Sequence, residues 1–280
     1  MAPPPGEDRD PVEKDAADDD DDDAVDDTED LDDDFAKLQQ TISNERRAAL
    51  NSQAHGIGDL LPFPFAPNIR PLTISDLESC LALENAAFRN PQHRCSREKF
   101  IYRLTACSEL SMGVFCTIVP SAIADTGFDL STMHTAHPVE TSRDDGAVSV
   151  LMAHIIATRS HEAVVTDKAM DYPRDYASVE TKPPSELGNQ ENGRTLCIHS
   201  LAVHPKLQGV GLGKLIMKCY LQRVKNSALG ERVALICQDY LVNYYKRFGF
   251  THAGPSEAAF GGGGWQDMTL EFGGSSTAEN

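Results

Sequence analysis

A glycine-rich segment between residues 204 and 214 has the composition of a phosphate-binding loop. The apolar run 196–203 before it predicts a strand, and apolar residues from 212 onward recur at helical spacing. Gly209, Gly211 and Gly213 would leave bare backbone N–H groups where that helix begins, and a helix N-terminus favours an anion. Because any Cβ would hold a phosphate away from these amides, glycine is needed there. The segment therefore predicts a site for a nucleotide that carries a pyrophosphate.

Two well-known phosphate loops do not fit this segment. Lys214 is followed by Leu215 rather than by Ser or Thr, which excludes the loop of nucleoside triphosphatases. The segment also lies late in the chain and lacks the acidic residue about 20 positions on that dinucleotide-binding folds use. A purely structural glycine turn remains as the alternative.

Glu84 is a candidate for proton transfer because it lies on the apolar side of its own predicted helix. Leu77, Leu81 and Phe88 stand at −7, −3 and +4 from it, so the carboxylate faces the core. A carboxylate is expensive to bury, and a buried one is either a working base or a structural partner in a hydrogen bond or ion pair. Position alone leaves both interpretations open.

His199 is the second candidate. In the predicted strand it alternates with Cys197, Leu201 and Val203 on one face. An imidazole with a pKa near 6.5 suits a proton relay at neutral pH, whereas the structural alternative is a hydrogen-bonded histidine of the sheet.

Four motifs in this order resemble one enzyme family. The segment 208–213 is similar to the Gln/Arg-x-x-Gly-x-Gly/Ala acyl-CoA loop of the GNAT acetyltransferase superfamily. Within that superfamily, 84–88 (ENAAF), 107–115 (CSELSMGVF) and 244–250 (YYKRFGF) resemble three segments of the arylalkylamine (serotonin) N-acetyltransferases. The resemblance covers about residues 68–272 and points to a fungal-type or polyamine-acetylating relative.

The resemblance implies a fold and three catalytic roles. The fold is α+β, with a splayed, mixed central sheet flanked by helices. Glu84 would act as general base through water, His199 as proton relay, and Tyr245 as the acid that protonates the departing coenzyme A. The family's strand carries His-x-His, and here Cys197 takes the first position. We therefore expect Glu84 and His199 to share the role of base, with direct transfer and no acyl-enzyme.

The resemblance also implies binding residues. Acetyl-CoA would contact residues of the strand, the loop and the later helix: Leu201, Ala202, Val203, Gln208, Gly209, Val210, Gly211, Gly213, Lys214 and Asn243. The acceptor amine would contact Leu110, Ser111, Met112, Gly113, Cys197 and Pro255. No histidine or cysteine spacing predicts a metal site.

The expected reaction is acetyl transfer to the primary amine of a small arylalkylamine such as serotonin, tryptamine or dopamine. Polyamine acetylation is the first alternative, because an acidic surface suits a polycation. Protein lysine or amino-terminal acetylation and a catalytically inert acyl-CoA-binding scaffold are less favoured.

Charge divides the chain into a tail and a domain. Of the net charge of −18, residues 1–37 contribute −15, and 18–23 is a run of six aspartates. Such a segment cannot bury enough apolar surface to fold. We expect an acidic, disordered arm over 1–55, a domain over 56–273 with insertions at about 120–146 and 160–193, and a disordered tail over 274–280. The arm is either solubilising or a binding site for a basic partner, and it argues against nucleic-acid binding.

The remaining sequence signals concern elements and compartment. Expected strands are 68–72, 111–119, 147–158, 196–203 and 233–237, with two more on either side of 261–264. Expected helices are 75–90, opened by a capping box from Ser75 to Glu78, then 96–106 and 241–248. Seven scattered cysteines predict reduced thiols, and no apolar run approaches the ~20 residues of a membrane span. We expect a cytoplasmic monomer, with the nucleus as the alternative compartment.

Overall fold

A computed structural model describes residues 54–61, 63–124, 136–138, 144–178 and 185–272, together with four single positions before 54. The chain divides into two units, Met1–Arg46 and Arg47–Asn280. The first unit falls almost wholly outside the described residues, as do most of the predicted arm, the predicted tail and much of the first predicted insertion. The sheet and the helices that flank it belong to the second unit.

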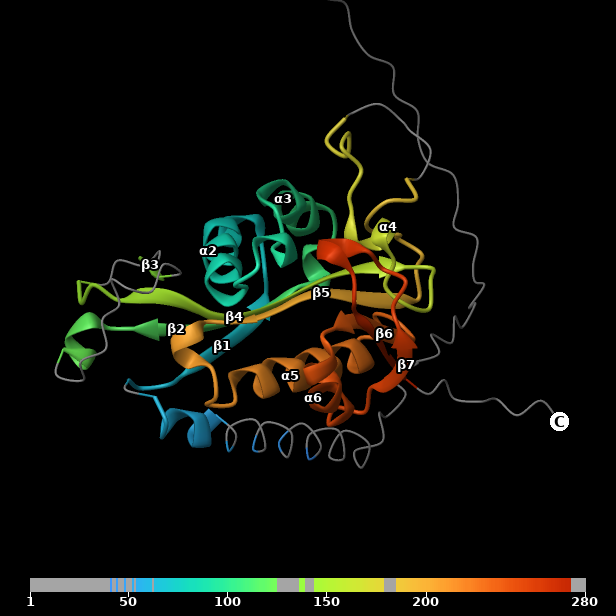
Figure 1. Ribbon diagram of the computed structural model, residues 1–280. Helices are drawn as coiled ribbons and strands as arrows, with labels where there is room; N and C mark the ends of the chain where they lie inside the picture. The colour runs from blue at the N-terminus through green and yellow to red at the C-terminus, as the bar shows by residue number, and fades with distance from the viewer. Residues whose placement is uncertain are drawn as a thin grey trace, which may run out of the picture. The chain divides into compact units, whose positions relative to one another are not determined.

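A mixed sheet runs through the whole domain (Figure 1). Its strands are β1 (Pro67–Pro71), β2 (Met112–Ile118), β3 (Ala136–Pro138), β4 (Val148–Ser160), β5 (Thr195–Val203), β6 (Arg232–Cys237), β7 (Thr251–Pro255) and β8 (Gln266–Glu271). Seven of them follow the order β1-β2-β4-β5-β6-β8-β7, and β3 pairs with β4. The β5–β6 pair is parallel, whereas β4–β5 and β6–β8 are antiparallel. The expected α+β class with a mixed sheet is confirmed.

Two helices, α2 (Leu77–Ala87) and α3 (Arg97–Ala106), cover one face of the sheet above β4 and β5 (Figure 1). Leu83 and Phe100 pack there against Leu151 and Ile156 of β4. The predicted capping box at Ser75 is wrong by two residues, because the Asp76 carboxylate accepts from the Thr73 backbone N–H (2.9 Å) and hydroxyl (3.2 Å). A short 3-10 turn therefore precedes α2.

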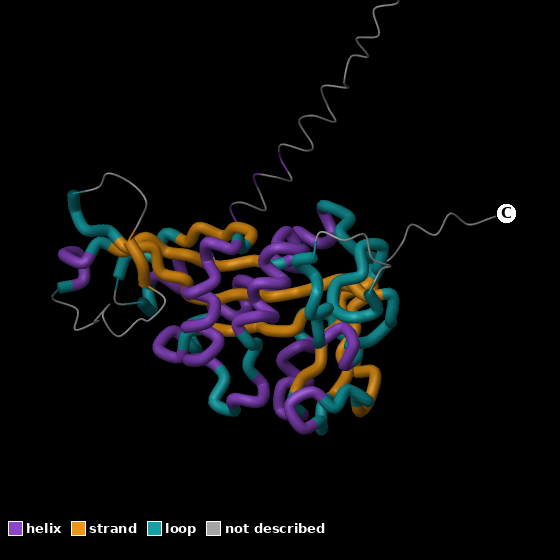
Figure 2. The backbone as a smooth tube through the Cα atoms, turned by 90° about the horizontal axis from the view of Figure 1, so that it is seen from above, coloured by secondary structure: helices purple, strands orange, loops and turns teal. Residues whose placement is uncertain are grey.

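The other face is covered by α5 (Leu212–Asn226), with α6 (Val242–Lys246) beside it. Leu212, Leu215, Ile216 and Tyr220 of α5 are buried at helical spacing, as the sequence predicts. In the view from above, the strands cross the molecule beneath α2 and α3, so that α5 and α6 lie on the far side of the sheet (Figure 2). Within the described part of the chain, no helix is long and apolar enough to cross a membrane.

Two irregularities of β5 shape the region at its carboxyl end. Pairing of β5 with β6 covers only Thr195–Ile198, so the two strands separate beyond Ile198. Opposite β4, the register shifts between Ile156, which faces Ser200, and Ala157, which faces Ile198. His199 is the extra residue of this β-bulge, and a bulge redirects the side chains beside it.

Candidate active site

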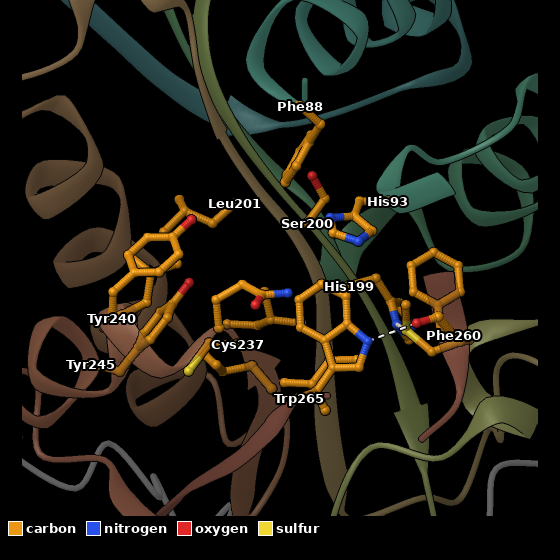
Figure 3. Close-up of a pocket in the computed structure, with 16 residues that line it drawn as sticks. Phe88, His93, His199, Ser200, Leu201, Cys237, Tyr240, Tyr245, Phe260 and Trp265 are labelled. Atoms are coloured by element: carbon orange, nitrogen blue, oxygen red, sulfur yellow. Dashed lines mark hydrogen bonds between the residues drawn. The ribbon is translucent and has the colours of Figure 1, made fainter. Parts of the chain in front are cut away.

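A cavity of about 140 Å³ opens where β5 and β6 separate; we call it the splay cavity (Figure 3). Both strands line it from the last residues that they pair with each other, Ile198 and Leu235, onward. Helix α6 and the turn before it close one side, and three segments distant in the sequence close the other. The lining residues are Phe88, His93, Met170, Ile198, His199, Ser200, Leu201, Leu235, Ile236, Cys237, Gln238, Tyr240, Leu241, Tyr245, Phe260 and Trp265.

A second hollow, which we call the loop groove, lies beside the glycine-rich segment. Its lining residues are Ala87, Phe88, Leu201, Val203, Gln208, Gly209, Gly213, Leu241, Tyr244 and Tyr245. Gly209 and Gly211 have φ values of +85° and +101°, which suit glycine, and α5 begins directly after Gly211. A Cβ built on Gly209 would have no heavy atom within 4 Å. The groove thus offers an open helix N-terminus that suits a pyrophosphate.

The two hollows share Phe88, Leu201, Leu241 and Tyr245. A ligand whose phosphates lie at the helix N-terminus would therefore reach the splay cavity along β5. The free edge of β5 beyond Ile198 has no β6 partner in the sheet and offers backbone groups to such a ligand.

Tyr245 lies at the junction of the two hollows. Its side chain is buried on α6, and burial beside Tyr244 and Cys237 raises the pKa of its phenol well above the ordinary value. The hydroxyl is therefore protonated at neutral pH and suits proton donation. Burial also raises the pKa of the Cys237 thiol to about 11, so this cavity-lining cysteine is a poor nucleophile at neutral pH.

His199 lines the splay cavity from the bulge. Its Nε2 lies 2.8 Å from the Thr158 hydroxyl and its Nδ1 lies 2.8 Å from the sulfur of Met170. Burial, with the cations of Arg103 and Lys99 nearby, lowers the pKa of His199 well below its usual value. The imidazole is neutral at neutral pH. The strict alternation that we expected for His199 is interrupted, because the bulge turns both His199 and Ser200 to the face that carries α2 and α4 (Asp167–Met170).

Glu84 is buried behind the wall of the splay cavity and does not line it. Its Oε2 accepts from the hydroxyl of Ser200 (2.6 Å) and from Nε2 of His154 (3.0 Å). Its Oε1 accepts from the backbone N–H of Cys95 (2.9 Å). These three donors offset the cost of burying a carboxylate. The predicted core-side carboxylate is therefore present, in a fully formed hydrogen-bond network.

Sequence reasoning missed two members of this network, His154 and Ser200. The sequence did carry a signal for His154, because successive side chains of β4 point to opposite faces of the sheet. His154, Ile156 and Thr158 therefore share the face toward α2. Ser200 gave no such signal, because a regular strand would point it away from His199. Only the bulge brings both side chains to one face.

The outer wall of the splay cavity is aromatic, and the sequence patterns did not predict it. The rings of His93 and Trp265 meet edge to face with centroids 4.8 Å apart, and the Trp265 indole N–H donates to the Phe260 carbonyl (2.7 Å; Figure 3). Asp167 of α4 (Asp167–Met170) accepts from the backbone N–H groups of Ala259 (3.0 Å) and Phe260 (2.9 Å). The second predicted insertion therefore contributes to this wall.

The predicted cofactor residues divide into two groups. Leu201, Val203, Gln208, Gly209 and Gly213 line the loop groove. The others do not line it, although they are neighbours in sequence: Ala202, Val210, Gly211, Lys214 and Asn243. Ala202 points to the opposite face of the sheet, into the core beneath α2.

The predicted acceptor residues are not brought to either hollow. Leu110, Ser111 and Met112 are buried, and a Cβ on Gly113 would meet Phe115, Leu72 and Leu151 within 3.0 Å. Cys197 is buried between β5 and α4, and Pro255 is exposed at the end of β7. Phe88, His93, Met170, Phe260 and Trp265 occupy the wall instead.

Comparison with known proteins identifies related sequences. Residues 184–272 match the profile of the acetyltransferase (GNAT) domain. The chain is 25% identical over 198 residues to serotonin N-acetyltransferase of Mesocricetus auratus, covering 70% of this chain and 73% of that protein. It is 34% identical over 73 residues to the enzyme of Macaca mulatta, covering 26% of this chain and only 36% of that protein.

Among solved structures, the loading GNATL domain of CurA from Lyngbya majuscula aligns with a TM-score of 0.47 and 13% identity. The alignment covers 74% of this chain and 98% of that domain. From these matches, residues 184–272 carry an acetyltransferase (GNAT) domain, and the chain resembles serotonin N-acetyltransferase.

Proposed function

We propose that the chain transfers the acetyl group of acetyl-CoA directly to the primary amine of a small arylalkylamine. The observation that carries the proposal is the junction at Leu201 and Tyr245, where the loop groove meets the splay cavity. A thioester held along β5 would place its reacting carbon there, and an amine in the splay cavity would meet it.

In the proposed reaction acetyl-CoA supplies the activated acetyl group. Glu84 accepts the proton of the ammonium, and the neutral amine attacks the thioester carbonyl. The backbone N–H of Leu201 stabilises the oxyanion. As the C–S bond breaks, the Tyr245 hydroxyl gives its proton to the thiolate and regains one from the amide nitrogen through solvent. His199, neutral and at the cavity wall, passes protons between the amine and solvent.

The chemistry of the splay cavity favours an aromatic acceptor over a polyamine. Its lining contains Phe88, Phe260 and Trp265 but no aspartate or glutamate, so it has apolar surface for a ring and no anion for a second ammonium. The positive charges of Lys99 and Arg103 lie close enough to affect His199, which lines the cavity, and they would repel a polycation.

An acceptor panel tests the proposal. We expect the full chain with acetyl-CoA to acetylate tryptamine, serotonin and dopamine with higher kcat/KM than spermidine or a lysine peptide, as measured by mass spectrometry of the products. A preference for spermidine would contradict the acceptor class, and acetyl-CoA binding without any product would contradict the enzymatic function.

Replacing Asp167 with Asn should weaken acceptor binding. The Asn side chain would turn its amide NH₂ toward one of the two backbone N–H groups that now donate to Asp167, so that one hydrogen bond is lost. The segment that carries Phe260 and Trp265 would then be held less firmly. From the usual worth of hydrogen bonds to a charged group, we expect KM for tryptamine to rise about 10-fold. KM for acetyl-CoA should hardly change in steady-state assays.

Lys168 offers a matched control on the same helix. It pairs with Glu186 on the surface and lines neither hollow, so Lys168→Ala should leave both KM values unchanged. Equal effects of the two substitutions would mean that the insertion does not position the acceptor.

A further inference from the structure

We propose that the hydroxyl of Ser200 carries the proton from the acceptor amine to Glu84, so that Ser200 is a catalytic residue and the base itself never contacts the substrate. The inference rests on the proposed function, because the relay needs an ammonium in the splay cavity. It concerns a residue for which sequence patterns give no role.

Glu84 has no direct route to the splay cavity. The side chain of Glu84 is only 2% exposed and lies under the wall formed by Phe88 and Ser200. Of the three groups that donate to its carboxylate, His154 and Cys95 do not line the cavity. Ser200 does, and it appears next to Phe88 in Figure 3. Among the described residues that donate to Glu84, Ser200 is therefore the one that connects the carboxylate to the cavity.

The hydrogen bond between Ser200 and Glu84 is already polarised for transfer. At 2.6 Å, the Ser200 hydroxyl donates to Oε2 of Glu84, because an ionised carboxylate only accepts. A lone pair of the Ser200 oxygen is then available for a proton from the cavity. One step moves the ammonium proton onto the Ser200 oxygen and the hydroxyl proton onto Glu84, giving a neutral amine, an intact serine and a carboxylic acid.

His154 has a positioning role in this relay. Its Nε2 contacts Glu84 Oε2 (3.0 Å) and the Ser200 oxygen (3.2 Å), while its Nδ1 has no hydrogen-bond partner among the described residues. The proton therefore belongs on Nε2, where it holds the oxygen of Glu84 that faces Ser200. With no partner at Nδ1, His154 fixes the carboxylate without taking the proton onward.

The test compares two acceptors in Ser200→Ala. For an arylalkylamine that is protonated at the assay pH, kcat should fall about 100-fold, within the range of general acid–base catalysis. For the aminooxy analogue, whose nitrogen is neutral before attack, kcat should fall less than about 10-fold. Ser200→Thr restores a hydroxyl and should regain most of the activity. KM for acetyl-CoA should not change.

Ser160→Ala is the matched control, because Ser160 is equally buried at the end of β4 but lines neither the splay cavity nor the loop groove. It should retain wild-type kcat with both acceptors. If Ser200→Ala does not fold, Glu84→Gln keeps the shape and the hydroxyl but removes the proton acceptor, and it should show the same selective loss.

The outcomes separate the relay from the proposed function. An equal loss on both acceptors, or no loss, in Ser200→Ala overturns the relay while the wild-type enzyme still acetylates amines. If the wild-type chain acetylates only another amine class, the acceptor proposal fails, and the same comparison made with that amine decides the relay. If wild type acetylates no amine at all, both proposals fall together.

Discussion

Tyr245→Phe is expected to lower kcat by about 100-fold or more while KM for acetyl-CoA stays close to the wild-type value. The phenol lies at the junction of the loop groove and the splay cavity, and burial holds its pKa well above the ordinary value. The proton is therefore available at neutral pH for the departing thiolate. Removing one oxygen leaves the ring and its packing against Phe250, so the effect should appear in turnover rather than in binding.

Tyr244→Phe is the control for this substitution. Tyr244 is adjacent, lines the loop groove and also loses a hydroxyl, but it does not line the splay cavity. Steady-state kinetics at saturating acceptor should show a kcat near the wild-type value for Tyr244→Phe. Equal losses in the two variants, or a fall in acetyl-CoA affinity that accounts for the whole effect in Tyr245→Phe, would remove Tyr245 from the role of acid.

The loop and its flanking elements could be predicted from the sequence because their causes are local. A glycine-rich turn, an apolar strand and a helical apolar repeat depend on residues within about one turn or one pleat of each other. The structure places β5 within one residue of the expected bounds, and α5 begins at Leu212, where the helical apolar repeat starts. Glu84 could likewise be placed on the core side, because helical periodicity alone decides which side of α2 it occupies.

The walls of the cavity could not be predicted in the same way. The bulge at His199 depends on how β4 and β5 pair, and one extra residue reverses which side chains share a face. Trp265, His93 and Asp167 come together from segments about 70 to 170 positions apart, through contacts that no short spacing encodes. Family segments around 110–113 suggested an acceptor wall, yet those residues pack in the core.

Gly209→Asp is expected to raise the Kd for coenzyme A by about 10- to 100-fold. Asp tolerates positive φ better than most residues, so the backbone at +85° should persist. The added carboxylate would enter open space beside the start of α5, where the proposed pyrophosphate lies. Repulsion between such charges near a surface is worth roughly 1.5–3 kcal/mol after screening by solvent, and it should shrink as salt is added.

Gly146→Asp matches this substitution in everything except location. Gly146 also has a positive φ, of +66°, and a Cβ there would also meet no heavy atom within 4 Å, but it lines neither hollow. Calorimetric titration of coenzyme A into the two variants at low and high salt separates backbone strain from charge. Backbone strain would weaken coenzyme A binding in both variants alike. Charge repulsion from a pyrophosphate at the loop groove would weaken binding in Gly209→Asp alone, and to a degree that depends on salt. Identical Kd values would mean that the phosphates bind elsewhere, because a new negative charge on the loop could not then be near them.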